Sequence, residues 1–392
     1  MNKTLLIIAG VSAILLLVAI WLYLLIYGTP KPIEQFFTDF SFAENSDITP
    51  LTPFIPEVTN GQVDVDDLVQ LRQLTLKPTI GFGEKISITN NEQLMLYAEA
   101  GTGHVFSIDL VTGTEIRLSN ITITNPQLAK FSPNGEYVAI RSGYGAQNTV
   151  ELLTLAGENS ATKVTLIPKM VDFNFNDNNQ LLYSEFSSVG LTGKELNPTT
   201  KTIRTLFSVP FQSATFIWSM TTTTPHYVYP KASAKLTGFL YSFVGGTVNR
   251  LPIEGRGLTS FANSDYVIFS KQTGNGPASQ AYSVDKKTSS TLASTIDPNK
   301  CAFSKTELNI FYCGSTQETY GSEFPDDWYK GIRSYSDQLW RIDASKGSAS
   351  QLINPESVVG RAIDVTTMQT SSDGGVLYFT NKTDNTLWMY EI

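Results

Sequence analysis

Histidine and cysteine are scarce in this sequence, which contains two of each among 392 residues. The histidines are His104 and His226, and so few leave little room for histidine-based acid–base catalysis or for a metal site built from several histidines. The two cysteines, Cys301 and Cys313, are too few for a structural zinc site. We therefore predict that the protein binds no metal and no cofactor.

Charged side chains are also few. They make up 16% of the residues, the net charge is −8, and the lysines and arginines form no basic cluster. A nucleic-acid surface needs grouped cations to neutralise phosphates, so the composition excludes nucleic acid as a partner. The Gly-x-Ser-x-Gly, P-loop and Gly-x-Gly-x-x-Gly motifs are missing as well, and no catalytic residue can be assigned.

One long hydrophobic run is present. Leu5 to Tyr27 is a stretch of 23 residues without a charged side chain, and at about 1.5 Å per helical residue it spans the ~30 Å core of a bilayer. A cleaved signal peptide is the alternative, but its apolar region is usually about 7–15 residues long and ends in small residues. We predict an uncleaved signal anchor over residues 1–27. Lys3 before the run favours a cytoplasmic N-terminus, with the rest of the chain outside the cytoplasm.

Residues 28–70 read as a tether rather than as a folded unit. Pro, Ser, Thr and acidic residues alternate there with short aromatic patches, and proline at this density opposes both helices and central strands. From residue 71 to residue 392 there is no long pattern of helical period. Short strand-like runs alternate instead with turns rich in Gly, Asn, Asp, Ser and Thr.

Hairpins recur in this second part at a regular interval. In Phe131-Ser-Pro-Asn-Gly135, Pro fixes φ while Asn and Gly tolerate positive φ, and strand-forming residues follow from Tyr137 to Ile140. Seven hairpins align on one aromatic or apolar position: Tyr97, Ile140, Tyr183, Tyr229, Phe269, Tyr312 and Phe379. The intervals are 43, 43, 46, 40, 43 and 67 residues, and five of them lie near the ~40–45-residue period of a four-stranded propeller blade.

This period predicts an all-β fold, a seven-bladed β-propeller over residues 71–392. The last unit is one strand short, and a spare strand lies at the beginning, in residues 71–75. Pairing of the spare strand with the last blade closes the ring and removes two sheet edges that would otherwise be open to aggregation. Six or eight blades are the alternatives, because the fourth unit is weakly patterned.

The repeat resembles that of TolB-like or WD40-like β-propellers. Their Phe-Ser-Pro-Asp-Gly signature corresponds to Phe131–Gly135, and Ser371–Gly375 is a weaker copy. Longer segments are similar to membrane-anchored propeller proteins of candidate-phylum, Patescibacteria-type bacteria: Gly101–Asp109, Arg117–Asn120, Phe324–Tyr329 and Ser334–Trp340. The resemblance implies the propeller and the anchor. It implies no activity and no catalytic residues.

The two cysteines flank one predicted hairpin. If its turn is centred on Glu307, Cys301 and Cys313 lie directly opposite each other, as do Phe303 and Phe311. Opposed residues of a non-hydrogen-bonded pair have Cα atoms about 4.5 Å apart, which is within disulfide range. Oxidation is favoured outside the cytoplasm. We predict a disulfide, and two buried free thiols are the alternative.

The 67-residue interval contains an insertion of roughly one extra hairpin, about Gly314 to Asp337. Insertions in repeat folds often mark the binding face, and flat aromatic rings beside carboxylates suit a sugar ring or a peptide. The candidate binding residues are Tyr320, Phe324, Asp326, Asp327, Trp328 and Tyr329. In the alternative, the aromatic residues pin the insertion onto the propeller. Two adjacent carboxylates are a poor match for calcium, which takes about 6–8 oxygen ligands.

These features predict a non-enzymatic binding or scaffolding module. An anchor and a tether would hold the propeller on the extracytoplasmic side of the cell membrane, where it binds protein or glycan partners. A subunit of an envelope assembly fits the same features. The enzymatic alternative is a hydrolase or lyase that acts on glycans or peptides through carboxylates at the propeller channel. It requires two or more carboxylates with shifted pKa values to converge at the channel mouth.

Overall fold

The computed structural model describes residue 16 and residues 70–86, 93–143, 148–188, 190–221, 224–274 and 276–392. The predicted anchor (residues 1–27) and tether (residues 28–70) lie outside these ranges, except for Leu16 and Gln70. Within the described ranges, no helix is both long enough and apolar enough to cross a membrane.

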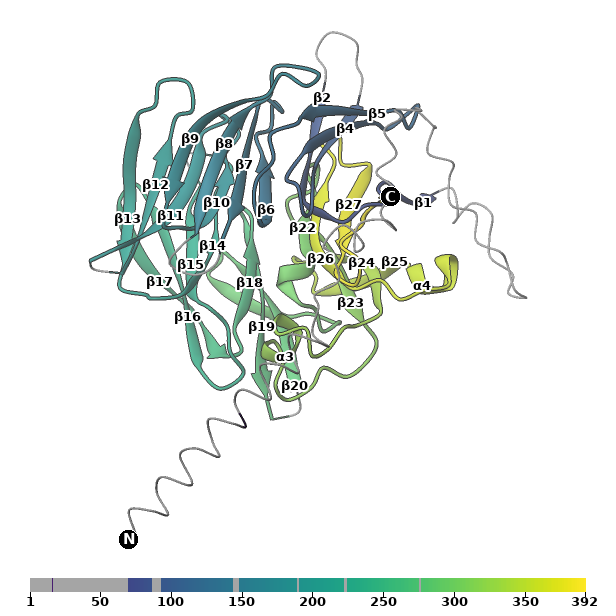
Figure 1. The fold of residues 1–392 in the computed structure, drawn as a ribbon. Helices are drawn as coiled ribbons and strands as arrows, with labels where there is room; N and C mark the ends of the chain where they lie inside the picture. The colour runs from purple at the N-terminus through teal and green to yellow at the C-terminus, as the bar shows by residue number, and fades with distance from the viewer. Residues whose placement is uncertain are drawn as a thin grey trace, which may run out of the picture. The chain divides into compact units, whose positions relative to one another are not determined.

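The chain forms seven four-stranded antiparallel sheets, which are the blades of a β-propeller (Figure 1). Blade 1 is β2 (Thr79–Ile86), β3 (Gln93–Glu99), β4 (Val105–Asp109) and β5 (Glu115–Ser119). Blade 2 is β6 (Pro126–Phe131), β7 (Tyr137–Ser142), β8 (Thr149–Thr154) and β9 (Thr162–Pro168). Blade 3 is β10 (Met170–Phe175), β11 (Leu181–Ser187), β12 (Gly190–Leu196) and β13 (Ile203–Val209).

The remaining blades follow the same plan. Blade 4 is β14 (Ala214–Ile217), β15 (His226–Pro230), β16 (Thr237–Val244) and β17 (Thr247–Arg256). Blade 5 is β18 (Thr259–Ala262), β19 (Tyr266–Thr273), β20 (Gly276–Ser283) and β21 (Thr288–Thr291). Blade 6 is β22 (Cys301–Phe303), β23 (Ile310–Thr316), β24 (Asp337–Asp343) and β25 (Ser348–Ile353). Blade 7 is β26 (Val365–Thr370), β27 (Val376–Asn381), β28 (Leu387–Glu391) and β1 (Leu71–Gln73).

Short helical segments join some of these strands. They are η3 (Pro298–Lys300), which leads into β22, α3 (Asp326–Tyr329), which lies between β23 and β24, and α4 (Pro355–Val359), which follows β25. The interval between β23 and β24 is the insertion that the broken period predicts. It joins the second and third strands of blade 6, so it lies at the end of the propeller where the innermost strands begin.

The start of the described chain completes the last blade. β1 pairs antiparallel with β28, with Leu71 opposite Tyr390 and Gln73 opposite Trp388. Beyond β1, Thr75 continues the contact, because the backbone N–H of Leu387 donates to its Oγ1 at 2.9 Å. Pairing of the two ends of the propeller places one strand from the start of the chain beside three from its end.

The prediction of seven blades is confirmed, and the alternatives of six or eight are wrong. Each of the seven aligned sequence positions lies in the second strand of its own blade, including Tyr229 of the weakly patterned fourth unit in β15. The second strands are apolar on both faces because each is covered on both sides. In β3, Met95 and Tyr97 pack toward blade 7, whereas Leu96 and Ala98 pack toward blade 2.

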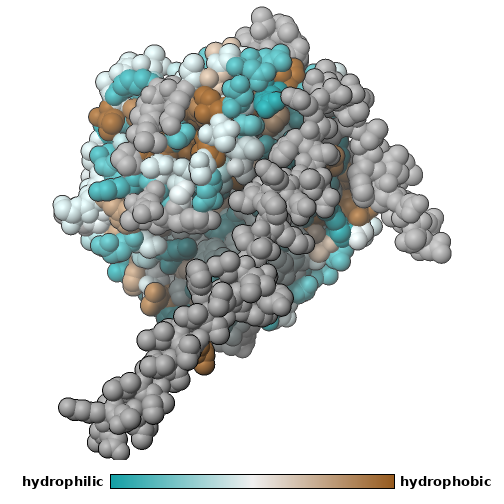
Figure 2. Space-filling model, viewed as in Figure 1, coloured by the Kyte–Doolittle hydropathy of each residue, from teal (hydrophilic) through white to brown (hydrophobic). Residues whose placement is uncertain are grey.

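The hydrophobic core is divided among the gaps between blades. Seven clusters of buried residues each join two consecutive blades, and one of them joins blade 7 to blade 1, which closes the ring. On the described part of the face shown in Figure 2, hydrophobic side chains are scattered among polar ones. Most of the apolar surface is therefore buried between neighbouring blades, where it stabilises their packing.

The Phe131–Gly135 turn is structural. Gly135 has φ of +67°, a region that favours glycine, and Ser132 Oγ accepts a hydrogen bond from Tyr137 N at 2.9 Å. Asn134 N donates to Asn179 Oδ1 at 2.9 Å, in the equivalent turn of blade 3. This hydrogen bond places the two turns at the same height along the propeller axis. Residues that are equally far from these turns therefore lie at about the same height on their inner strands.

Candidate functional site

The first strands of all seven blades surround a central cavity of about 710 Å³. Its wall is mixed in character, with apolar side chains such as Leu128, Ile217 and Phe261 beside polar ones such as Asn174 and Gln369. A cavity of this volume is in the range of small-molecule and cofactor sites. We call this cavity the channel.

A lysine and an aspartate from adjacent inner strands face the channel. Lys130 is in β6 and Asp172 is in β10, and both are part-buried. Trp218 Nε1 donates a hydrogen bond to Asp172 Oδ1 at 3.1 Å, which fixes the carboxyl group. Burial raises the pKa of Asp172, against the opposing effects of the Trp218 hydrogen bond and of Lys130. Burial lowers the pKa of Lys130, although Asp172 opposes this.

A second carboxyl group, that of Glu84 in β2, also lines the channel. Its Oε2 accepts a hydrogen bond from Ser372 N at 2.6 Å, while its Oε1 is buried without a partner among the described residues. Burial raises the pKa of Glu84, and the Ser372 hydrogen bond opposes the rise. The channel thus contains two carboxyl groups with raised pKa values.

These two carboxyl groups lie at different levels. Gly83 of β2 packs on Phe131 of β6, since a Cβ on Gly83 would lie 2.7 Å from Phe131 Cβ. Phe175 occupies the same level in β10. Glu84 is one residue beyond this level and Asp172 is three residues before it, which separates them by roughly 13 Å along the strands at ~3.3 Å per residue. Paired carboxylates in glycoside hydrolysis are at most about 9.5 Å apart, so Glu84 and Asp172 do not form such a pair.

The insertion turns most of its aromatic residues inward. Tyr320, Phe324, Trp328 and Tyr335 form one buried cluster, with Tyr329 packed against it. Trp328 is 6% exposed and Phe324 is 2% exposed. A side chain that is already covered by its own protein has little surface left for a ligand, so these rings form the core of the insertion itself.

The polar candidates of the insertion make contacts within the protein as well. Asp326 Oδ2 accepts a hydrogen bond from Ala234 N at 2.6 Å, and Asp327 forms an ion pair with Arg333 at 3.3 Å. Both carboxylates are therefore engaged within the protein, and they contact different partners.

Tyr329 links the insertion to the channel. Its hydroxyl accepts a hydrogen bond from Asn299 Nδ2 at 3.1 Å, and Asn299 is one of the residues that line the channel. The ammonium of Lys231 lies 5.5 Å from the centre of the Tyr329 ring. The insertion therefore reaches the rim of the channel, at the end where the inner strands begin.

A fully buried cation lies beneath the insertion. Lys300 Nζ donates to Asp337 Oδ2 and to Asp364 Oδ1, each at 2.6 Å, and all three side chains are fully buried. Trp328 Nε1 donates to both oxygens of Asp364, at 2.9 and 3.0 Å. Burial alone would lower the pKa of Lys300, but the carboxylates of Asp337 and Asp364 raise it. This cluster connects the insertion to blades 6 and 7.

One carboxyl group beside this cluster is only half satisfied. Asp297 Oδ1 accepts hydrogen bonds from the backbone N–H and the side-chain amide of Asn299, at 3.1 and 2.9 Å. Its Oδ2 has no partner among the described residues. Burial raises the pKa of Asp297 to about 6, and Lys300 opposes the rise.

The raised pKa of Asp297 predicts a pH-dependent stability. The folded protein binds this proton more tightly than the unfolded chain, whose aspartates titrate near 3.9, so the contribution of Asp297 is largest below pH 4 and is lost as the pH rises to about 6. Relative to Asp297→Asn, we expect the wild type to lose roughly 2–3 kcal/mol over this range. Urea unfolding of both proteins at pH 4, 5, 6 and 7 measures the difference.

The opposite slope should appear for a control carboxyl group. Burial would raise the pKa of Asp343, but hydrogen bonds from Ser345 and Asn309 lower it. The loss in free energy of unfolding caused by Asp343→Asn should therefore become smaller as the pH falls. Parallel stability profiles for the wild type and Asp297→Asn would show that Asp297 does not titrate differently in the folded state.

Cys301 and Cys313 form a disulfide in the structure. They are opposite residues of β22 and β23, their Cα atoms are 4.1 Å apart, and both residues are buried. Phe303 and Phe311 are also opposite each other. The disulfide joins the two strands next to the Lys300 cluster.

The two histidines are separate and structural. His226 Nδ1 accepts a hydrogen bond from Ser219 N at 3.0 Å, and burial lowers the pKa of His226 to about 4. His104 Nε2 lies 3.1 Å from Thr122 Oγ1 at the surface. Neither histidine lines the channel. The described residues contain no group of three or more His, Cys, Asp or Glu that could hold a metal ion.

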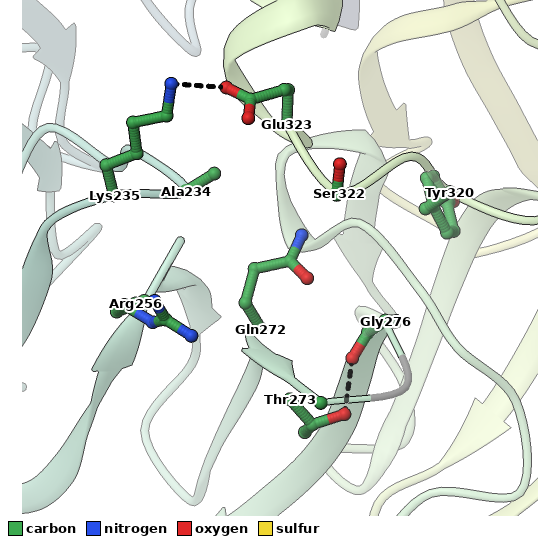
Figure 3. A pocket seen from close by; sticks show the side chains of 10 residues that line it. Ala234, Lys235, Arg256, Gln272, Thr273, Gly276, Tyr320, Ser322 and Glu323 are labelled. Atoms are coloured by element: carbon green, nitrogen blue, oxygen red, sulfur yellow. Dashed lines mark hydrogen bonds and ion pairs between the residues drawn. The ribbon is translucent and has the colours of Figure 1, made fainter.

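A smaller pocket of about 480 Å³ lies between blades 4 and 5 and the edge of the insertion (Figure 3). Lys235 and Glu323 form an ion pair of 3.0 Å across its rim, and Arg256 and Gln272 extend into it from the opposite side (Figure 3). Both members of the ion pair are more than half exposed, and exposed pairs contribute little to stability. The rim of this pocket is therefore held only weakly.

The channel residues Lys130 and Asp172 are not among the residues that the sequence pattern singles out. The available signal is a charged residue at an inward position of an otherwise apolar inner strand, as in Pro126–Phe131 and Met170–Phe175. That signal alone does not distinguish a side chain in a channel from one at a blade edge. Lys300, which directly precedes β22, gives no signal of its own.

No protein-family model matches this chain, and no curated protein matches its sequence. Solved β-propellers match its structure. Oligogalacturonate lyase from Vibrio parahaemolyticus is 10% identical, with a TM-score of 0.56 over 87% of this chain and 96% of that chain. The propeller domain of the Trilobed protease from Pyrococcus furiosus is 9% identical, with a TM-score of 0.51 over 81% and 94%. The propeller domain of Swd1 from Myceliophteria thermophila is 10% identical, with a TM-score of 0.52 over 82% and 99%. At these identities the likeness shows the fold alone, a β-propeller of the kind that the TolB-like or WD40-like resemblance implies.

Proposed function

We propose that this protein is a membrane-anchored binding module, whose central channel receives part of a protein or glycan partner on the extracytoplasmic side of the cell membrane. The observation that carries the proposal is the channel itself. It is lined by residues from all seven inner strands and contains charged, amide, hydroxyl and aromatic groups. Such a wall offers both flat apolar contact and polar groups that orient a ligand.

Two features favour binding over catalysis. The two channel carboxyl groups with raised pKa values, those of Glu84 and Asp172, are separated by about four residues along the inner strands, roughly 13 Å. They cannot act on one bond as an acid and a base. The insertion, whose aromatic residues are turned inward, contributes Tyr329 at the channel rim rather than an exposed binding face.

The location of the module is supported by the hydrophobic run of Leu5 to Tyr27 and by the resemblance to membrane-anchored propeller proteins. The disulfide between Cys301 and Cys313 agrees with an oxidising compartment. An anchor that precedes a tether would leave the propeller free to reach a partner near the membrane surface.

Site-specific photo-crosslinking in intact cells tests this proposal. A photoreactive amino acid is placed at Gln369, which lines the channel, or at Ile116, which is 43% exposed on β5 at the edge of blade 1. We expect the channel probe to capture a distinct partner that the control probe at Ile116 does not capture. Equal capture from both positions, or none from the channel, contradicts the proposal.

The location is measured in the same cells. Ile116→Cys should react with a membrane-impermeant maleimide without cell lysis if the propeller is extracytoplasmic. Labelling only after lysis would contradict the extracytoplasmic placement, whatever the crosslinking shows. A channel adduct that is found only as a cleaved product would favour the hydrolase or lyase alternative.

A further inference from the structure

Lys130 is a cation without a matching anion in the channel wall. It forms no hydrogen bond or ion pair with any residue that the structure describes, although its side chain is part-buried in the cavity. A buried charge is costly unless it is paired. The nearby carboxyl group of Asp172 interacts with Lys130 over a distance, but its Oδ1 is engaged by Trp218.

A second cation lies behind this pair. Arg141 of β7 uses Nη1 to donate to Val171 O at 3.0 Å, while its Nε is buried without a partner in the described part of the chain. Asp172 is the one acidic group that acts on both Lys130 and Arg141. Two cations therefore share one carboxyl group, which leaves this end of the channel with an excess of positive charge.

The neighbouring wall can accommodate a ligand that brings the missing negative charge. Asn174 lines the channel on β10, the inner strand next to that of Lys130, while Thr215 lines it on β14 and Thr367 on β26. These are neutral groups that can hydrogen-bond to the polar part of a ligand. Ile217 and Phe261 add apolar surface.

We infer that Lys130, with Arg141 behind it, forms a subsite for the carboxylate group of a ligand that enters the channel. This inference deepens the proposed function and rests on it, since it assumes that a ligand occupies the channel. A lysine ammonium and a carboxylate form a charge-assisted hydrogen bond, which is stronger than a neutral one. The carboxylate is that of a sugar acid or of an acidic side chain of a peptide, and the chemistry recognised is the same in both.

The charges around the subsite predict how binding changes with pH. The groups around it are Lys130 on β6, Arg141 on β7, Asp172 on β10 and Tyr229 on β15, and Glu84 lines the channel on the adjacent inner strand β2. Burial raises the pKa of Asp172 and lowers that of Lys130. Protonation of either group makes the subsite more positive. A carboxylate ligand should therefore bind more tightly as the pH falls.

Calorimetric titration of the purified full-length protein with matched probes tests the inference. The sugar pair is glucuronate and glucose, and the peptide pair is the methylamide of N-acetylglutamate and that of N-acetylglutamine. We expect at least one acid to bind about tenfold more tightly than its neutral counterpart, as a charge-assisted hydrogen bond implies. The pair that shows the difference identifies the source of the carboxylate.

Three variants assign the effect to residues. Lys130→Met should abolish the preference for the acid, and Asp172→Asn should tighten acid binding at pH 7 and reduce its pH dependence to the part that Lys130 contributes. Lys346→Met is the control, because Lys346 is 78% exposed and does not line the channel, so its loss should leave acid binding unchanged. Thermal unfolding of each variant shows that it is folded.

Several results would overturn the inference. These are equal affinity for the acids and their neutral counterparts, an unchanged preference in Lys130→Met, or an equal loss in Lys346→Met. Such results would leave the proposed function intact if channel crosslinking still captures a partner. If the crosslinking fails but the acid is still preferred, the proposal of a macromolecular partner is wrong and the inference of a carboxylate subsite stands.

Discussion

Replacement of Lys300 by methionine is expected to lower the free energy of unfolding by about 3–5 kcal/mol. Lys300 is fully buried, and its ammonium contacts Asp337 and Asp364 at 2.6 Å each. Methionine has a similar length but no charge, so Asp337 would lose its cation and Asp364 would keep only Lys382, whose Nζ lies 3.7 Å from its Oδ2. The cost comes from that uncompensated charge rather than from lost volume. Urea unfolding at pH 7 measures it.

Two further variants separate this explanation from a simple packing defect. Lys300→Met combined with Asp337→Asn and Asp364→Asn should recover much of the lost stability, because no unpaired charge is left. Lys346→Met is the exposed control. Lys346 is 78% exposed and 3.5 Å from Asp343, and loss of such a pair should cost less than about 1 kcal/mol. A Lys300→Met protein as stable as the wild type would contradict the role given to this lysine.

Replacement of Trp328 by alanine is expected to cost about 3–5 kcal/mol as well, the usual range for a buried tryptophan. The ring is 6% exposed and packs within the aromatic cluster of the insertion. Its Nε1 donates to both oxygens of Asp364, and the ammonium groups of Lys300 and Lys382 lie 5.0 and 4.6 Å from the ring centre. The substitution would remove the packing and leave Asp364 with fewer donors.

This experiment also decides between the two interpretations of the insertion. If Trp328 holds the loop in place, Trp328→Ala lowers stability and makes the insertion sensitive to proteolysis. If it is instead a ligand-binding residue, stability is unchanged and only partner capture is lost. Ile332→Ala, in the same insertion, is the matched control, since Ile332 is 73% exposed and its truncation should change stability by less than about 0.5 kcal/mol.

The Lys300 and Trp328 variants should not be additive. Both residues act on Asp364, so the double variant should lose less than the sum of the two single losses. Additive losses would mean that the insertion and the buried ion cluster are independent units.

The propeller could be predicted because its signal is repeated and local. Tyr97, Tyr183 and Tyr312 occupy the same place in their own blades, and a strand that is covered on both faces must be apolar on both. The broken interval between Tyr312 and Phe379 also located the insertion correctly, between β23 and β24. These properties follow from the alternation of side chains along a strand and from the fixed number of strands in a blade.

The channel could not be predicted in the same way. Lys130 and Asp172 are 42 residues apart in the sequence, and they meet only because consecutive inner strands lie side by side around one axis. Lys300, Asp337 and Asp364 likewise come from three separate segments. The local sequence pattern of a single strand does not specify these contacts.

The sequence by itself therefore determined the repeat, its period and the place where the period is interrupted, and it predicted seven blades with six or eight as alternatives. The scarcity of histidine argued against histidine-based catalysis, and the missing basic cluster argued against nucleic-acid binding. Neither observation identified a function. Only the tertiary structure decided which way the insertion faces and which charges lie in the channel. The physical reason is that a period along the chain fixes the contacts between neighbouring strands, whereas a site at the centre of a ring is built from residues whose proximity depends on closure of the whole ring.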